Sequence, residues 1–197
     1  MNLPNKITTF RMICVIFVIG LLLWPANWYI IPYINVSLNF FIAWIIFIIA
    51  SLSDMVDGKI ARKYNMVTDY GKFMDPIADK LLVNSTLIAL SVYGPIKIPI
   101  ICVILMIARD IVVDALRMNA VRKNIVLPAN IWGKLKTVLQ MIALVFILIN
   151  DFGLDQLLNI PNYLMIGQCL IYLATLASVL SCVIYCVKNR KVFSEME

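Results

Sequence analysis

The chain has 197 residues and a formal net charge of +6, and 62% of it is hydrophobic while only 14% is charged. Soluble globular domains are roughly 45–50% apolar and about 25% charged. The composition therefore excludes a soluble globule, a disordered chain and a nucleic-acid-binding protein. We instead expect a single all-α, integral-membrane domain over residues 1–197, because each membrane span needs roughly 20 residues.

The hydrophobic pattern predicts six transmembrane helices in chain order. Their expected bounds are about 7–25, 36–57, 71–93, 98–119, 130–150 and 163–187. Helix breakers such as Pro25, Pro128 and the Gly94-Pro95 pair separate most of them. Residues 1–6, with Pro4 near their start, are expected to form a short interfacial helix before the first span.

The basic residues indicate the orientation of this bundle. With the N-terminus in the cytoplasm, 16 of the 17 Lys and Arg residues fall on the inner side and Lys97 alone on the outer side. Inner loops of membrane proteins carry such an excess of Lys and Arg. The pattern therefore predicts an even number of spans and two cytoplasmic termini. Several charges must also enter the inner halves of helices, which predicts a polar cavity there beneath a dry outer half.

Four carboxylates are the strongest candidates for chemistry. Asp54 and Asp57 are three residues apart at the end of the second predicted span, and Asp75 and Asp79 are four apart at the start of the third. Either spacing places a pair on one helical face. Because the connection is short, we expect antiparallel neighbouring helices whose four carboxylates converge at the inner surface. The chain has no His, so an all-oxygen site for two divalent cations, Mg²⁺ or Mn²⁺, is predicted.

The residues around these carboxylates resemble a known family. The pattern is Asp54-x₂-Asp57-Gly58-x₂-Ala61-Arg62-x₈-Gly71-x₃-Asp75-x₃-Asp79. It is similar to the signature of the CDP-alcohol phosphotransferases, or CDP-alcohol phosphatidyltransferases, at all eight defined positions. The stretches 4–11, 108–110 and 133–137 resemble the bacterial phosphatidylglycerophosphate synthase branch, which usually has Glu where Asp110 stands.

The resemblance implies roles for individual residues. Asp54, Asp57, Asp75 and Asp79 match metal ligands, and Asp79 also matches the general base. The positions that match the CDP-diacylglycerol site are Asn5, Thr8, Asp57, Gly58, Ala61, Arg62, Thr68 and Gly71. The resemblance further implies a homodimer in the bacterial cytoplasmic membrane, with its active site on the cytoplasmic side.

Four further cations indicate the acceptor of the transferred group. Arg109 and Arg117 are eight residues apart, about two helical turns, and therefore share a face. Lys134 and Lys136 lie near the start of the fifth predicted span. So many cations favour a phosphorylated acceptor, and glycerol 3-phosphate fits, giving phosphatidylglycerophosphate and CMP. Phosphatidylglycerol, inositol phosphate and serine are alternative acceptors, and a divalent-cation carrier is the alternative from another class.

Overall fold

A computed structural model of the chain describes residues 3–24, 29–63, 69–122, 131–154 and 165–188. The side chains of 54–63, 69, 70 and 72 lie outside this description. The described helices are α1 (Leu3–Leu23), α2 (Leu38–Lys63), α3 (Asp69–Tyr93), α4 (Ile100–Arg122), α5 (Ile131–Leu148) and α7 (Ile166–Lys188). Each overlaps one predicted span, so the prediction of a helical bundle is confirmed.

The expected separate helix over residues 1–6 is wrong for the residues described. Helix α1 runs without a break from Leu3. Pro4 lies in its first turn, where a proline removes no intrahelical hydrogen bond. Nothing between Pro4 and the apolar run interrupts the helix, so this segment forms the first turn of α1.

Six membrane crossings remain a prediction. Among the described residues, three segments are long and apolar enough to span a membrane: Asn5–Leu23 in α1, Ile131–Leu148 in α5 and Ile166–Lys188 in α7. The apolar part of α2, Leu38–Ser53, is shorter. Helices α3 and α4 instead carry charged residues along one face. Large apolar side chains such as Ile16 and Leu176 point outward, which suits a lipid environment.

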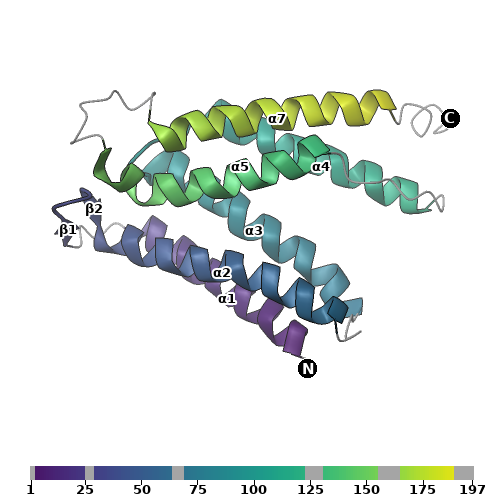
Figure 1. Cartoon of the computed structure of the whole chain (residues 1–197), viewed down its shortest axis with the longest axis horizontal. Coiled ribbons are helices and arrows are strands. Elements are labelled where there is room, and N and C mark those ends of the chain that lie inside the picture. The colour runs from purple at the N-terminus through teal and green to yellow at the C-terminus, as the bar shows by residue number, and fades with distance from the viewer. Residues whose placement is uncertain (1–2, 25–28, 64–68, 123–130, 155–164, 189–197) are drawn as a thin grey trace.

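The helices form two packed groups (Figure 1). Helix α1 packs along both α2 and α3, while α7 packs along α5 and α4. Weaker contacts of α3 with α4 and α5, and of α2 with α5, join the groups. Fully buried residues from all six helices meet in one apolar core: Val18, Phe47, Leu90, Met106, Ile147 and Ile171. The start of α1 and the end of α7 lie toward the same end of the molecule.

The opposite end contains two features that the all-α prediction missed. Strands β1 (Ile30–Ile31) and β2 (Val36–Ser37) form a small antiparallel ladder. The 3₁₀ turn η1 (Asn150–Gly153) packs on this hairpin. Gly153 has φ +75°, and a Cβ atom there would lie 2.6 Å from the Tyr33 carbonyl oxygen. Glycine is therefore required both for the backbone conformation and for the close contact.

This end also contains a buried charge. The carboxylate of Asp151 is completely buried. Both of its oxygens accept from the backbone N–H of Gly167 at the start of α7, at 3.1 and 3.0 Å. A carboxylate is stabilised at a helix N-terminus by the unpaired N–H groups and the helix dipole. Asp151 is therefore well placed to cap α7.

Candidate active site

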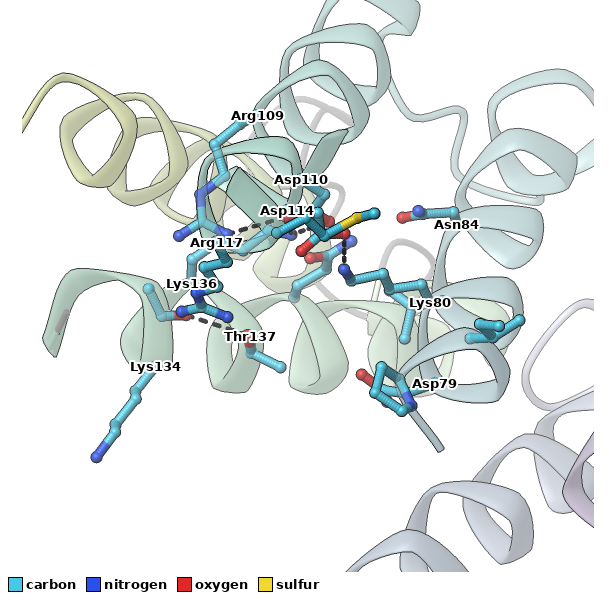
Figure 2. Close-up of a pocket in the computed structure, with 16 residues that line it drawn as sticks. Asp79, Lys80, Asn84, Arg109, Asp110, Asp114, Arg117, Lys134, Lys136 and Thr137 are labelled. Carbon is cyan, nitrogen blue, oxygen red and sulfur yellow. Dashed lines mark hydrogen bonds and ion pairs between the residues drawn. The ribbon is translucent and has the colours of Figure 1, made fainter. Parts of the chain in front are cut away.

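A cavity of about 630 Å³ opens between α3, α4 and α5 (Figure 2). Its walls come from residues 76–84, 109–118 and 133–140. These are the first half of α3, the second half of α4 and the first half of α5. Because consecutive helices run in opposite directions, the three segments meet toward one end of the bundle. The structure thus places a polar cavity where the sequence predicted one.

Helix α3 presents the two carboxylates of the signature that the structure describes. Asp79 lines the cavity. Asp75, one turn earlier, accepts a hydrogen bond of 2.6 Å from the hydroxyl of Thr8 on α1. Thr8 is 1% exposed, and the neighbouring Asn5 is also buried. The first turns of α1 therefore pack against the start of α3, next to the signature carboxylates.

Most of the remaining signature falls outside the described side chains. Residues 54, 57, 58, 61 and 62 belong to the last turns of α2, but their side chains are among those not described, and Thr68 is not described at all. Gly71 is buried in the first turn of α3. Within the part of the chain that the structure describes, no group of three metal-binding side chains is found. The predicted convergence of Asp54 and Asp57 with Asp75 and Asp79 stays a prediction.

The predicted antiparallel pairing of α2 and α3 at the signature stays a prediction, because the side chains of 54–63 and residues 64–68 lie outside the description. Among the described residues, α2 and α3 have few contacts with each other, and α1 packs extensively against both. Figure 1 shows the α2 end and the α3 start approaching one another beside α1. Thr8 therefore lies where α1 meets the signature, a position that the sequence spacing of the carboxylates does not reveal.

One carboxylate organises the predicted acceptor cations. Asp110 on α4 accepts from Arg109 Nη1 at 3.0 Å and from Lys136 Nζ on α5 at 2.8 and 3.0 Å. Lys136 is only 3% exposed. A buried ammonium needs such a partner, because an unpaired charge in a low-dielectric interior is very unfavourable. Although Asp is shorter than the Glu usual in the resembled branch, Asp110 reaches both cations.

Arg109 is also held from a second side. Its Nη2 atom donates to the hydroxyl of Ser181 on α7 at 2.8 Å. Gly133 on α5 lies directly beneath the guanidinium, and a Cβ atom there would come within 2.8 Å of Nη2. The Arg109 head group therefore occupies a slot that α4, α5 and α7 build together, and this slot requires a residue without a side chain at 133.

The other two predicted cations are more open. Arg117 and Lys134 are exposed and line the cavity. The guanidinium of Arg117 lies 5.9 Å from the centre of the Tyr185 ring, within cation–π range. Among the described residues, neither forms an ion pair with a carboxylate. The structure thus brings all four predicted cations to one cavity, where two share Asp110 and two keep their charge available.

Sequence reasoning missed several residues of this site. Lys80 pairs with Asp114 across α3 and α4, and the amide side chains of Asn84 and Gln140 line the cavity. A signal for Asp114 was present, since it lies four residues after Asp110 and so on the same helical face. The amides carried no motif, and only the tertiary structure brings them to the site.

Three described helices that are long and apolar enough to cross a membrane, with apolar side chains pointing outward and a charged cavity, indicate a membrane protein with a polar site. The family model described as CDP-alcohol phosphatidyltransferase matches residues 1–187. The chain belongs to the CDP-alcohol phosphatidyltransferase family. It is therefore an enzyme, a phosphatidyltransferase, as the signature resemblance implied.

Relatives with curated names agree with this assignment. A Mycoplasma pneumoniae protein is 41% identical over 157 residues, covering 77% of this chain and 68% of its own. A Bacillus subtilis protein is 39% identical over 156 residues, covering 78% and 80%. A Rickettsia bellii protein is 33% identical over 193 residues, covering 98% and 97%. All three are named CDP-diacylglycerol–glycerol-3-phosphate 3-phosphatidyltransferase.

Proposed function

We propose that the enzyme transfers the phosphatidyl group of CDP-diacylglycerol to glycerol 3-phosphate, giving phosphatidylglycerophosphate and CMP. One observation carries the proposal: Asp79 of the signature and the four predicted acceptor cations line the same cavity. In the view of Figure 2, Asp79 and Lys134 stand on opposite sides of the cavity. A small acceptor with a phosphate at one end and a hydroxyl at the other fits this arrangement. The names of the relatives support the same pair of substrates.

The cations divide the binding of the acceptor phosphate between them. Arg117 and Lys134, which lack a carboxylate partner among the described residues, supply the charge that attracts it. Arg109, fixed by Asp110 and Ser181, offers a guanidinium in a set orientation, and guanidinium groups bind phosphate bidentately. Lys136 completes the positive field from its buried position. An uncharged or zwitterionic acceptor such as serine would leave these cations without a function.

The donor site lies on the other side of α3. By family resemblance, Asn5, Thr8, Asp57, Gly58, Ala61, Arg62, Thr68 and Gly71 line the CDP-diacylglycerol site. The hydrogen bond from Thr8 to Asp75 supports this assignment, because it brings the N-terminal motif into contact with the signature. Thr8 then holds the Asp75 carboxylate in one orientation next to the nucleotide.

The donor atoms of the signature suit two divalent cations, Mg²⁺ or Mn²⁺. Asp54, Asp57, Asp75 and Asp79 offer only carboxylate oxygens, the ligands that hard cations prefer. The α3 start, with Asp75 held by Thr8 and Asp79 facing the cavity, is compatible with this role. Bound there, such ions supply charge neutralisation to the pyrophosphate and the leaving group.

The chemical step is a displacement at phosphorus. Asp79 takes the proton from the primary hydroxyl of glycerol 3-phosphate. At the same time, the oxygen of this hydroxyl attacks the phosphorus that carries diacylglycerol. The new P–O bond forms while the bond between this phosphorus and the bridging oxygen of CMP breaks. The electron pair of that bond leaves with CMP. Positioning and electrostatic stabilisation provide most of the acceleration in phosphoryl transfers of this kind.

The setting of the enzyme follows the charge pattern of the sequence. We place it in the bacterial cytoplasmic membrane as a multi-pass protein, with both termini and the active site in the cytoplasm. CDP-diacylglycerol then reaches the site from the membrane and glycerol 3-phosphate from the cytosol. The family resemblance adds a homodimer, with residues 1–197 as one domain in each copy.

An acceptor panel tests the proposal. Purified protein receives labelled CDP-diacylglycerol, Mg²⁺ or Mn²⁺, and glycerol 3-phosphate, inositol phosphate, serine or phosphatidylglycerol in turn. We expect CMP release and a labelled phosphatidylglycerophosphate only with glycerol 3-phosphate. CMP release with serine alone would overturn the acceptor assignment. A protein that releases no CMP with any of the four acceptors would contradict the whole proposal.

Gly133→Ala is expected to separate acceptor binding from stability. The new Cβ would displace the flexible Arg109 head group from Ser181. Loss of one charge-assisted hydrogen bond should raise KM for glycerol 3-phosphate about tenfold. Loss of this hydrogen bond also lowers stability, but alanine favours a helix over glycine by about 0.8–1.0 kcal/mol and offsets much of that loss, so the unfolding temperature should change little. Michaelis–Menten curves for each substrate and thermal unfolding in detergent measure the two effects.

Gly20→Ala is the matched control. Gly20 lies in α1, and a Cβ there would meet nothing within 4 Å. It should therefore gain the same helix propensity and leave KM for both substrates unchanged. An equal rise of KM for the lipid donor in Gly133→Ala would show that residue 133 acts on the whole site rather than on Arg109.

A further inference from the structure

Two amide side chains in the cavity have polar atoms that no described residue satisfies. Gln140 on α5 is 1% exposed. Its Nε2 atom is buried without a hydrogen-bond partner among the described residues, and so is the Oδ1 atom of Asn84 on α3. Both residues line the cavity. Because unpaired buried polar atoms are unfavourable, these two atoms point to a bound polar group that completes their hydrogen bonding.

The positions of the amides show what kind of group this is. Asn84 lies one turn beyond Lys80 on α3, and Gln140 lies one turn beyond Lys136 on α5, so each shares a face with its lysine. Lys80 is paired with Asp114, and Lys136 shares Asp110 with Arg109. The amides thus lie in the same cavity as the phosphate-binding cations and Asp79, but they carry no charge themselves.

A neutral hydroxyl matches this pair of atoms. An amide N–H donates to the hydroxyl oxygen, and an amide oxygen accepts the hydroxyl proton. Glycerol 3-phosphate has three polar groups: the phosphate, the reacting primary hydroxyl and, on the middle carbon, a secondary hydroxyl. The first is matched by the cations and the second by Asp79. The third has no partner in the proposed function as described above.

We propose that Asn84 and Gln140 form a subsite for the secondary hydroxyl of the acceptor and so select a polyol phosphate over a simple hydroxyalkyl phosphate. This inference rests on the proposed acceptor class. Sites that hydrogen-bond a substrate hydroxyl discriminate strongly against analogues without it, because the polar groups of the site are then left unpaired. Asn84 and Gln140 are therefore specificity-determining residues of the acceptor site.

The test compares glycerol 3-phosphate with 3-hydroxypropyl phosphate, which keeps the phosphate, the primary hydroxyl and the three-carbon chain but lacks the secondary hydroxyl. We expect the full-length enzyme, assayed with CDP-diacylglycerol, to prefer glycerol 3-phosphate in kcat/KM by at least about tenfold. Gln140→Met and Asn84→Leu remove the amides at similar volume. In these variants, the ratio of kcat/KM for glycerol 3-phosphate to that for 3-hydroxypropyl phosphate should fall toward one. The fall should come from glycerol 3-phosphate alone, with the rate for 3-hydroxypropyl phosphate unchanged.

Gln168→Met is the matched control. Gln168 is also buried and also has an unsatisfied amide oxygen among the described residues, but it lies in α7 outside the cavity lining. Its replacement should leave the preference intact. If Gln140→Met does not fold, the preference of the wild-type enzyme and its loss or retention in Asn84→Leu test the proposed subsite.

Three results would overturn the inference. They are a wild-type enzyme without preference, variants that lose both acceptors equally, and an equal loss of preference in Gln168→Met. Failure of the proposed function gives a different result. The enzyme would then release no CMP with glycerol 3-phosphate or 3-hydroxypropyl phosphate, and would release it with serine or phosphatidylglycerol.

Discussion

Asp79→Asn should abolish turnover while the protein still inserts and folds. A positioned general base contributes about 10²–10⁴-fold to a rate, and Asp79 is also a proposed metal ligand, so we expect kcat to fall by at least about 10³-fold. Asparagine has nearly the same shape but cannot take the proton of the acceptor hydroxyl. Asp79 lines an open cavity, so the packing of α3 should tolerate the change. CMP release per folded enzyme, together with the thermal unfolding midpoint in detergent, measures both effects.

Asp151→Asn gives the opposite pattern and serves as the control. Asp151 lies in η1, away from the cavity, and is fully buried. Its carboxylate accepts from the backbone N–H of Gly167 at the N-terminus of α7. Removing its charge should lower the unfolding midpoint, because the start of α7 loses its carboxylate partner. The kcat of the remaining folded enzyme should change less than about twofold. If Asp79→Asn kept a tenth of the wild-type kcat, Asp79 would not be the base.

The sequence alone predicted the elements of the bundle well, for a simple physical reason. Each apolar run long enough for a helix is separated from the next by prolines, glycines or charges, so helices α1 to α5 and α7 begin and end close to their predicted positions. The two-residue strands and η1 were missed because they carry no hydrophobic period. The left-handed Asn35, Asn150, Asp151 and Phe152 depend on tertiary contacts rather than on a local pattern.

Helix rotation and helix order were harder to predict. In a membrane protein, a lipid-facing residue is as apolar as a core residue, so hydrophobicity does not show which face of a helix points inward. The sequence placed Asp75 and Asp79 on one face of one helix. In the structure, α1 packs against both α2 and α3, and Asp75 accepts a hydrogen bond from Thr8, 67 residues away in the chain. This pairing depends on α1 packing against α3, which no spacing in the sequence encodes.

The acceptor site shows the same division between composition and geometry. The sequence identified Arg109, Arg117, Lys134 and Lys136 as candidates because they are four cations on the predicted cytoplasmic side, where the signature carboxylates also lie. The structure adds what each cation touches, since Asp110, Ser181 and Gly133 lie on three different helices. The identity of the charged residues was therefore predictable, while the division into neutralised and available cations required the structure.

Asp110→Asn should be among the most destabilising substitutions in this chain. Asp110 is the carboxylate partner of Lys136, which is almost completely buried. Removing one partner of a buried ion pair typically costs 3–5 kcal/mol, because the other charge remains uncompensated. Lys136→Met should cost less, since Asp110 keeps its bond with Arg109 at 3.0 Å. Unfolding midpoints of the purified variants in one detergent allow the comparison.

The double variant Asp110→Asn/Lys136→Met separates stability from function. With the buried ammonium gone, the amide at 110 has no charge to neutralise, so the double variant should recover much of the stability that Asp110→Asn loses. The two substitutions are then strongly non-additive, as expected for residues in direct contact. Affinity for the acceptor should not recover, because Lys136 is absent and Arg109 has lost its carboxylate. If the stability losses simply add, Asp110 and Lys136 do not depend on each other in the folded protein. Their ion pair would then have no part in holding the cavity together.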